Sequence, residues 1–291
     1  MMRSLLFIPG NLPNMIQNAY LFDADAIIFD LEDAVLPSEK DNARNLIREF
    51  LSKNSNKKNT LNFIRINEVG GEFYKDDLEL IVSDNIDAIV LPKANVSSVQ
   101  TLERALSNIE KSKELQKMIH IIPIIEQATS ILQVDQIASL PRVIGLILGG
   151  EDLTKDVEVK RTSEGNELLY SRSRIIMACA AYKITSIDTP YTDVYDDSGF
   201  EKDTLNAAAL GMKAKCAIHP RHIEFINQAF SPTKEEIEHA YKVVEAKKNA
   251  ELEGKGSFTV DGKMVDKPVV ERAINVIEKA KKFNLVKDDE E

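Results

Sequence analysis

The sequence predicts an α/β protein of the (β/α)8 TIM-barrel class with a C-terminal helical appendage. Short apolar runs alternate with segments of helical pattern along most of the chain. Eight successive strand-then-helix units are typical of a closed barrel, which usually takes about 250 residues. Most of the runs are almost continuously apolar, as expected of parallel strands covered on both faces. An open doubly wound sheet is the alternative, but it usually has fewer units, and no GxGxxG motif follows the first run.

Eight apolar runs supply the expected strands. In chain order they are Ser4–Ile8, Ala26–Phe29, Asn62–Ile66, Ala88–Leu91, Ile119–Ile125, Val143–Leu148, Ile184–Ile187 and Ala214–Ile218. The segments between them have helical patterns. Ser38–Asp41 opens one helix with a serine cap and an acidic first turn, and Ser97–Lys117 is long and amphipathic.

The pattern changes after His219-Pro220, where the barrel is predicted to close. Residues 1–230 are expected to form the catalytic domain, and residues 231–291 a C-terminal appendage. The appendage is predicted to contain a charged helix, a short hairpin and a last helix, at Pro232–Ala250, Phe258–Met264 and Pro268–Phe283. Asp261-Gly262 suits the tight turn of the hairpin.

The composition excludes several classes of protein. The formal net charge is -10 over 291 residues, so non-specific nucleic-acid binding is not expected. No apolar run approaches bilayer length, and the first residues, MMRSLLFIPGN, lack the features of a signal peptide. Cys179 and Cys216 form no CxxC pair, which argues against a disulfide framework or a thiolate zinc site. We therefore expect a cytoplasmic protein with no membrane partner.

Polar and charged residues follow most of the apolar runs. Active-site groups of a barrel come from the carboxyl ends of its strands, so these residues are expected on one face. They are Pro9-Gly10-Asn11, Asp30-Leu31-Glu32-Asp33, Arg65-Ile66-Asn67, Pro92-Lys93, Glu126-Gln127, Gly149-Gly150-Glu151-Asp152 and His219-Pro220. One charged strand end is usually a capping or solvated residue. Several together, of both signs, predict an active site.

Glu126 and Asp152 are the most specific candidates for metal ligands, because they end neighbouring strands. Two carboxylates, with the remaining positions left to water and substrate oxygens, commonly hold Mg2+ in proteins. The chain has four histidines and no HxxxH spacing near these acids, so zinc is disfavoured. Purely structural roles are the alternatives: a helix cap for Asp152 and a buried ion pair with Arg65 or Lys93 for Glu126.

Arg65 suits the clamping of a carboxylate or an enolate oxygen, since its guanidinium is planar and bidentate. Together with the two carboxylates, it suggests a Mg2+-assisted reaction at a carbonyl flanked by a carboxylate, passing through an enolate.

With these residues in view, the chain resembles the citrate lyase beta chain and malyl-CoA/citramalyl-CoA lyase family, a group of phosphoenolpyruvate/pyruvate-type barrels. The resemblance runs over nearly the whole chain and depends on the order and spacing of weak motifs. They are RSLLFIPGN at Arg3–Asn11, DLEDAV at Asp30–Val35, RIN at Arg65–Asn67, LPKA at Leu91–Ala94, IIE at Ile124–Glu126, LGGEDL at Leu148–Leu153, SRSRI at Ser171–Ile175, AIHP at Ala217–Pro220 and GKMVDKP at Gly262–Pro268.

The resemblance implies roles for individual residues. Glu126 and Asp152 match the Mg2+ carboxylates, and Arg65 matches the arginine that binds the keto-acid fragment and steadies its oxyanion. Asp266 matches an aspartate that reaches a neighbouring subunit's site as acid or base. The implied reaction is Claisen-type cleavage of a 3-hydroxy-3-carboxyacyl thioester to an acetyl thioester and a 2-oxo acid. The implied assembly is a homotrimer or larger, or part of a multi-subunit lyase complex.

Further residues are expected to bind the substrate or its carrier. Gly10, Lys93, Arg65 and Glu126 are assigned to the substrate, and Lys215 and Arg3 to the phosphates of CoA or of an acyl carrier protein. Asp30, Glu32 and Asp33, the three acids at the end of the second expected strand (the strand-two acids), are expected to support the metal site from beside it. Among them, Glu32 is the one expected to approach the metal waters, with Lys40 and Arg44 offsetting excess negative charge.

The chain departs from the family pattern near the proposed metal site. Gln127 and Ser130 stand where the family commonly has threonine and glycine, which leaves the substrate open. Besides a thioester lyase, two alternatives remain. One is an aldolase acting on free hydroxy-oxo acids, for which Asp266 would be unnecessary, and the other is a non-catalytic subunit on the same barrel.

Overall fold

The computed structural model describes residues 1–54, 60–252 and 258–286 of the chain. The chain divides into two compact units, one of residues 2–227 and one of residues 228–291 together with Met1. Among the described residues, no helix combines the length and the apolar composition needed to cross a membrane.

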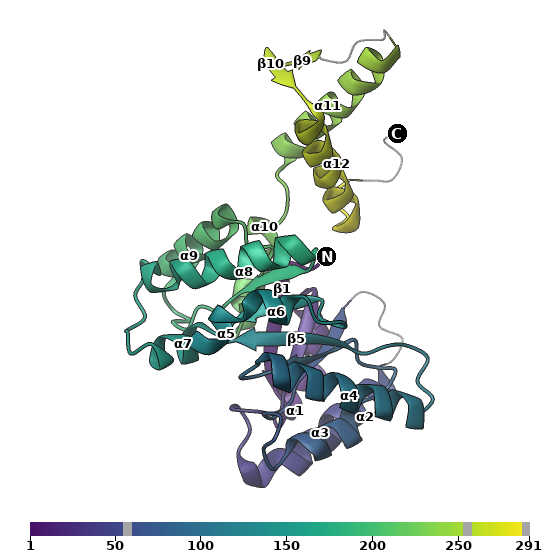
Figure 1. Cartoon of the computed structure of the whole chain (residues 1–291), viewed down its shortest axis with the longest axis vertical. Helices are drawn as coiled ribbons and strands as arrows, with labels where there is room; N and C mark the ends of the chain where they lie inside the picture. The colour runs from purple at the N-terminus through teal and green to yellow at the C-terminus, as the bar shows by residue number, and fades with distance from the viewer. Residues whose placement is uncertain (55–59, 253–257, 287–291) are drawn as a thin grey trace. The chain divides into compact units, whose positions relative to one another are not determined.

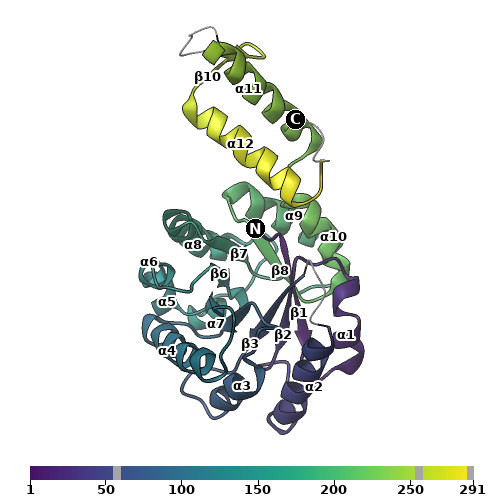
Figure 2. The ribbon, with the colours of Figure 1, turned by 90° about the vertical axis from the view of Figure 1, so that its right-hand side faces the viewer.

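The larger unit is a closed barrel of eight parallel strands (Figure 2). The strands are β1 (Ser4–Pro9), β2 (Ala26–Asp30), β3 (Leu61–Arg65), β4 (Ala88–Leu91), β5 (His120–Ile125), β6 (Gly145–Leu148), β7 (Thr185–Asp188) and β8 (Ala214–Ala217). Each strand pairs with the next, and β8 closes onto β1, where Leu5 pairs with Cys216. The predicted (β/α)8 barrel is confirmed, with strand bounds that differ by at most two residues from the expected ones.

Helices cover the outside of the barrel between successive strands, and a further helix, α10, follows the last strand (Figures 1 and 2). They are α1 (Pro13–Gln17), α2 (Lys40–Lys53), α3 (Tyr74–Ile81), α4 (Val96–Ser112), α5 (Ala128–Leu132), α6 (Val134–Ala138), α7 (Gly150–Asp156), α8 (Leu169–Tyr182), α9 (Asp197–Leu210) and α10 (Ile223–Ala229). The capping of α4 is strong, because Asn95 and Ser98 form a reciprocal capping box. The expected cap at Ser38 is wrong. Ser38 lies in a 3-10 turn, and the residue before α2 makes no side-chain capping bond.

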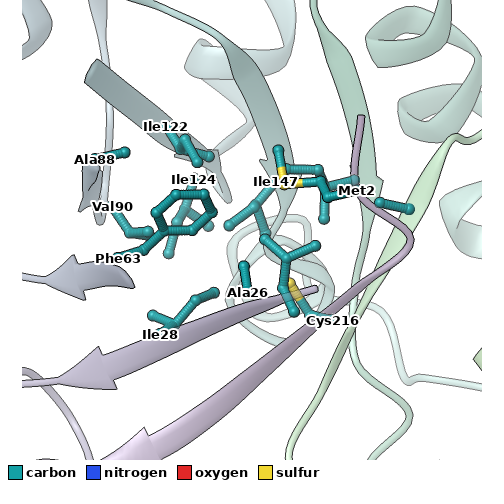
Figure 3. Close-up of a cluster of buried hydrophobic side chains, with 13 residues drawn as sticks. Met2, Ala26, Ile28, Phe63, Ala88, Val90, Ile122, Ile124, Ile147 and Cys216 are labelled. Carbon is teal, nitrogen blue, oxygen red and sulfur yellow. The ribbon is translucent and has the colours of Figure 1, made fainter. Parts of the chain in front are cut away.

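The barrel interior is filled by alternate residues of the strands (Figure 3). They include Ala26 and Ile28 of β2, Phe63 of β3, Ile122 and Ile124 of β5, and Ile147 of β6. Side chains two positions apart on a strand share a face. Asp30, Arg65 and Glu126 each stand two residues beyond one of these interior residues, so they face inward at the carboxyl ends of their strands.

The smaller unit contains two helices and a hairpin. Its elements are α11 (Lys234–Leu252), β9 (Phe258–Val260), β10 (Lys263–Val265) and α12 (Lys267–Lys282). The hairpin turns at Asp261-Gly262, where both φ angles are positive, as a two-residue hairpin turn requires. Apolar residues of both helices and of the hairpin form a separate small core.

Candidate active site

A cavity of about 340 Å³ lies where the barrel strands end. Its apolar wall includes Phe7, Ile124 and Ile147, which belong to the top of the barrel interior. Its polar wall combines residues from the ends of β2, β3 and β5 with the start of α7. This is the face on which barrel enzymes place their active sites.

Arg65 is the last residue of β3, and its guanidinium is held on two sides. Its Nε and Nη2 donate to the two oxygens of Asp30, at 2.7 and 2.5 Å, and its Nη1 lies 3.0 Å from Glu32 Oε2. The Phe7 ring lies beneath it, 5.1 Å from ring centre to guanidinium carbon. Burial disfavours the charged form, but the hydrogen bonds and negative charge of Asp30, helped by Glu32, outweigh it and raise the pKa of Arg65. The guanidinium is therefore charged and fixed in place.

Glu126 follows β5 and is almost fully buried at the cavity wall. Its Oε1 accepts the backbone N–H of Lys93 at 2.5 Å. Gly149 makes room for it, because a Cβ there would lie only 2.4 Å from the Glu126 Cβ. Burial, opposed by that hydrogen bond and aided by the charges of Glu32 and Asp152, raises the pKa of Glu126 to about 7.

Asp152 lies in the first turn of α7 and lines the same cavity. The residue before this helix is Gly149, and no side chain caps the helix, so the capping alternative for Asp152 is wrong. Glu126 bonds to the Lys93 backbone N–H. In the part of the chain that the structure describes, it forms no ion pair with Arg65 or with the Lys93 ammonium. The sequence-derived pair thus converges on one cavity.

The charges that line the cavity do not balance. Five of the described lining residues carry carboxylates and only Arg65 carries a cationic side chain; the acids are Asp30, Asp33, Glu126, Glu151 and Asp152. Glu151 pairs with Arg161 outside the lining, and Arg65 is engaged by Asp30 and Glu32. Among the described residues, Glu126 and Asp152 form no ion pair. In the described ranges, no cluster of three or more histidine, cysteine or acidic side chains forms a metal cage. Two carboxylates with room for water and substrate oxygens fit Mg2+ rather than a closed zinc site.

The strand-two acids divide differently from the expectation. Asp30 and Asp33 line the cavity, whereas Glu32 packs between Arg65 and Lys93, whose Nζ lies 3.6 Å from Glu32 Oε1. Burial is the main cause that raises the pKa of Glu32 to about 7, and the positive charge of Arg65 opposes it. Glu32 therefore contacts the arginine clamp, and its charge also helps to raise the pKa of Glu126. Its expected place beside the metal waters stays a prediction.

Lys40 and Arg44 differ in how they relate to these acids. Lys40 Nζ donates to the backbone carbonyls of Leu31 and Glu32, at 2.6 and 2.8 Å, and so fixes the loop that carries the acids. Burial lowers the pKa of Lys40, and the negative charges of Asp30, Glu32 and Asp33 oppose that shift, so Lys40 offsets these acids as expected while it also holds the backbone. Arg44 pairs with other carboxylates instead, with Asp77 at 2.7 Å and also with Asp41.

Two predicted binding residues are corrected by their positions, and a third stays a prediction. The Gly10 N–H donates to the Asp30 carbonyl, and a Cβ at Gly10 would lie 2.6 Å from that oxygen, so close packing requires this glycine, and its substrate contact stays a prediction. Arg3 precedes β1, at the amino end of the barrel, and pairs there with Asp25. Lys215 is fully buried within β8 and cannot reach a carrier phosphate.

Lys215 instead belongs to a group that the sequence reasoning missed. We call it the buried charge quartet: Arg172 of α8, Asp188 of β7, Asp203 of α9 and Lys215 of β8. The signal was available, because Asp188 ends an apolar run as Asp30 does. Its position one residue after Ile187, an interior residue, places it on the outer face of the barrel.

Asp266 lies in the smaller unit. Its side chain caps α12 by accepting the N–H of Val269 at 3.2 Å, and it is exposed. Its predicted acid–base role stays a prediction.

The fold and the site define a class: a (β/α)8-barrel enzyme whose cavity presents a fixed arginine and two carboxylates that, among the described residues, form no ion pair. Comparison with known proteins identifies the group within that class. Residues 3–220 match the model of the HpcH/HpaI aldolase/citrate lyase family, so the chain belongs to this family and is a lyase.

Curated relatives and solved structures agree with this placement. The chain is 38% identical over 289 residues to the citrate lyase subunit beta of Leuconostoc mesenteroides, covering 98% of this chain and 95% of the relative. It is 32% identical over 300 residues to the L-malyl-CoA/beta-methylmalyl-CoA lyase of Rhodobacter capsulatus, covering 96% and 94%. A structure of CitE from Mycobacterium tuberculosis, in complex with magnesium, acetoacetate and coenzyme A, superposes with a TM-score of 0.76 at 27% identity, covering 96% and 98%.

Proposed function

We propose that the protein is a Mg2+-dependent carbon–carbon lyase that cleaves a 3-hydroxy-3-carboxyacyl thioester into an acetyl thioester and a 2-oxo acid. The observation that most supports this proposal is that Glu126, Asp152 and Arg65 line one cavity, which has excess negative charge. The relative solved with magnesium, acetoacetate and coenzyme A supports both the cation and the thioester. The carrier is CoA or an acyl carrier protein, and the acyl group is of the citryl, citramalyl or malyl type.

The bond that breaks joins the carbon bearing the hydroxyl group to the carbon next to the thioester. A base takes the hydroxyl proton as the 2-oxo acid forms, and the electron pair of the broken bond passes to the carbon next to the thioester carbonyl, which then takes up a proton to become the methyl group of the acetyl thioester. When bound, Mg2+ supplies Lewis-acid polarisation of the oxygen next to the carboxylate, and Glu126 and Asp152 would hold it.

Arg65 is the residue we assign to the oxygen that changes charge. Asp30 and Glu32 engage three of its five N–H donors, so the remaining donors suit the substrate's carboxylate or developing oxyanion. Because Asp30 and Glu32 fix the guanidinium before substrate arrives, little reorganisation is required during the reaction.

The smaller unit is proposed to complete the site of a neighbouring subunit in a homotrimer or larger assembly. Its Asp266 is exposed at the start of α12, and we assign it the proton exchange at the acetyl carbon. Lys93, whose side chain is partly exposed beside Glu32 and Glu68, is proposed to contact the substrate.

A side-by-side assay tests the proposal. Citramalyl-CoA, malyl-CoA, citryl-CoA and citryl carrier protein are incubated with and without Mg2+, and acetyl-thioester release is followed. Release from at least one thioester, dependent on Mg2+, is expected. Cleavage of free hydroxy-oxo acids alone would favour the aldolase alternative, and no cleavage of any substrate would favour a non-catalytic subunit.

Subunit mixing tests the role of Asp266. Inactive Asp266→Asn and inactive Glu126→Gln proteins are mixed and allowed to exchange subunits. If Asp266 acts in a neighbour's site, mixed assemblies should recover part of the activity. No recovery after verified exchange would remove the shared site from the proposal.

A further inference from the structure

The buried charge quartet lies on the outer face of the barrel, between the strands and two covering helices. Lys215 Nζ lies 2.6 Å from Asp188 Oδ2 and 2.8 Å from Asp203 Oδ2. Arg172 donates from Nε to Asp188 at 2.9 Å and from Nη2 to Asp203 at 2.7 Å. Two cations thus meet two anions, and all four side chains are buried. Such a group is costly to bury unless its geometry is complete.

The quartet has one contact that leads toward the cavity. The third hydrogen bond of Lys215 Nζ goes to the backbone carbonyl of Thr189, at 2.8 Å. Thr189 directly follows β7 and lines the cavity. A lysine ammonium has three donors, and here two carboxylates and this carbonyl accept all of them. The position of the Thr189 backbone is therefore tied to the quartet.

Thr189 in turn holds the first residue of α7. Its hydroxyl oxygen accepts the Gly150 N–H at 3.1 Å, and a Cβ at Gly150 would lie 2.9 Å from that oxygen. The Gly150 amide is one of the N–H groups that a helix start leaves without an intrahelical partner. Asp152 stands two residues further along the same helical turn. The chain of contacts thus runs from Lys215 through Thr189 and Gly150 to the turn that carries Asp152.

We propose that the buried charge quartet and Thr189 are positioning residues for Asp152, setting the start of α7 so that its carboxylate meets a divalent cation held by Glu126. This rests on the proposed function for the cation, but the placement of α7 is independent of it. Groups that orient metal ligands without touching the metal commonly change metal affinity by about 10- to 100-fold when they are lost.

The central test uses Thr189→Val, which keeps the shape of the side chain and removes the acceptor for the Gly150 amide. Thr189→Ser is the matched variant, since it retains the hydroxyl. Hydrogen–deuterium exchange of the peptide that contains α7 is measured in the metal-free proteins, and Mg2+ affinity is measured by titration calorimetry. Faster exchange and roughly tenfold weaker Mg2+ binding are expected for Thr189→Val only.

A second pair of variants tests the quartet itself. Lys215→Met combined with Asp203→Asn removes one charge of each sign and leaves Arg172 paired with Asp188. The combined variant should also speed exchange in α7 and weaken Mg2+ binding. Adding Thr189→Val to it should weaken binding by less than the product of the two separate effects, because both act through one contact.

The outcomes separate the two proposals. Unchanged exchange of α7 in Thr189→Val would overturn the positioning role, whatever the metal result. Independent, multiplicative effects of the two changes would overturn the route through Lys215. Faster exchange of α7 in a protein whose wild type binds no Mg2+ would overturn the proposed function while the positioning of α7 stands.

Discussion

Two groups of charged residues in the barrel differ in how completely their charges are satisfied. The buried charge quartet pairs two cations with two anions, and its lysine donors are all accepted. The cavity carboxylates Glu126 and Asp152 lie among further acids, with only Arg65 as a cation among the described lining residues. A balanced buried group serves the fold, whereas an unbalanced group at strand ends is suited to binding a cation. The contrast teaches that charge balance, not burial alone, distinguishes the two.

The largest effect is expected from Asp152→Ala. Removing this carboxylate should reduce thioester cleavage to the level of the metal-free protein, because only Glu126 remains to hold the cation. The melting temperature should change little, since Asp152 is partly exposed and forms no helix cap. An active, metal-independent Asp152→Ala protein would show that the unbalanced group is not a metal site.

Arg65→Lys comes next in size. A lysine cannot replace the bidentate contact with Asp30 and still present donors to the substrate. We expect kcat/KM to fall by about 100- to 1000-fold, as for loss of an oxyanion donor. Arg3→Lys is the matched control, because Arg3 pairs with Asp25 away from the cavity. Equal losses in the two variants would contradict the clamp.

Lys215→Met should act on stability. It leaves Asp188 and Asp203 with only Arg172 as a partner, and loss of one member of a buried charged group costs about 3 to 5 kcal/mol of unfolding free energy. Urea unfolding measures this loss. A change below about 1 kcal/mol is typical of exposed ion pairs. It would contradict the view that the buried charge quartet stabilises the fold.

The folding stability of the metal-free protein should fall as pH rises. This is the opposite of the effect of a carboxylate that is held in a salt bridge. The pKa of both Glu126 and Glu32 is raised to about 7 in the folded protein, from about 4.5. The folded state then binds more protons than the unfolded state between these values, so stability should fall as pH rises from about 4.5 to about 7.

Glu126→Gln separates the two acids in this experiment. Urea unfolding in a chelator, followed from pH 5 to pH 8, should show a smaller decline for the variant, on the order of 1 to 2 kcal/mol less. The part due to Glu32 should remain. Parallel curves of unfolding free energy against pH for the wild type and Glu126→Gln would mean that deprotonation of Glu126 does not destabilise the folded protein.

The sequence allowed the barrel to be predicted, and it singled out residues that the fold brings to one cavity, because both depend on local patterns. Continuous apolar runs marked the strands, and the polar residues that end them, such as Arg65 and Glu126, face inward by alternation. The same alternation was not applied to Lys215, which stands between the interior residues Ala214 and Cys216 and therefore points outward. Treating it as a rim cation was the error.

Other details depend on contacts that no spacing encodes. Asp30 takes the bidentate contact with Arg65, whereas Glu32 contacts a single nitrogen of the guanidinium, and this arrangement depends on the loop held by Lys40. The contact from Thr189 to Gly150 joins residues 39 positions apart. A hydroxyl and a glycine amide leave no charge pattern that could have revealed it.

The most direct test of the account is Mg2+ binding to the wild type and to Glu126→Gln, measured by titration calorimetry between pH 6 and pH 8. The account predicts one Mg2+ per chain in the wild type, an affinity that rises as pH passes about 7 because Glu126 must lose its proton, and loss of binding in the variant. Equal Mg2+ affinity in the two proteins would contradict the claim that the unbalanced cavity carboxylates form the metal site.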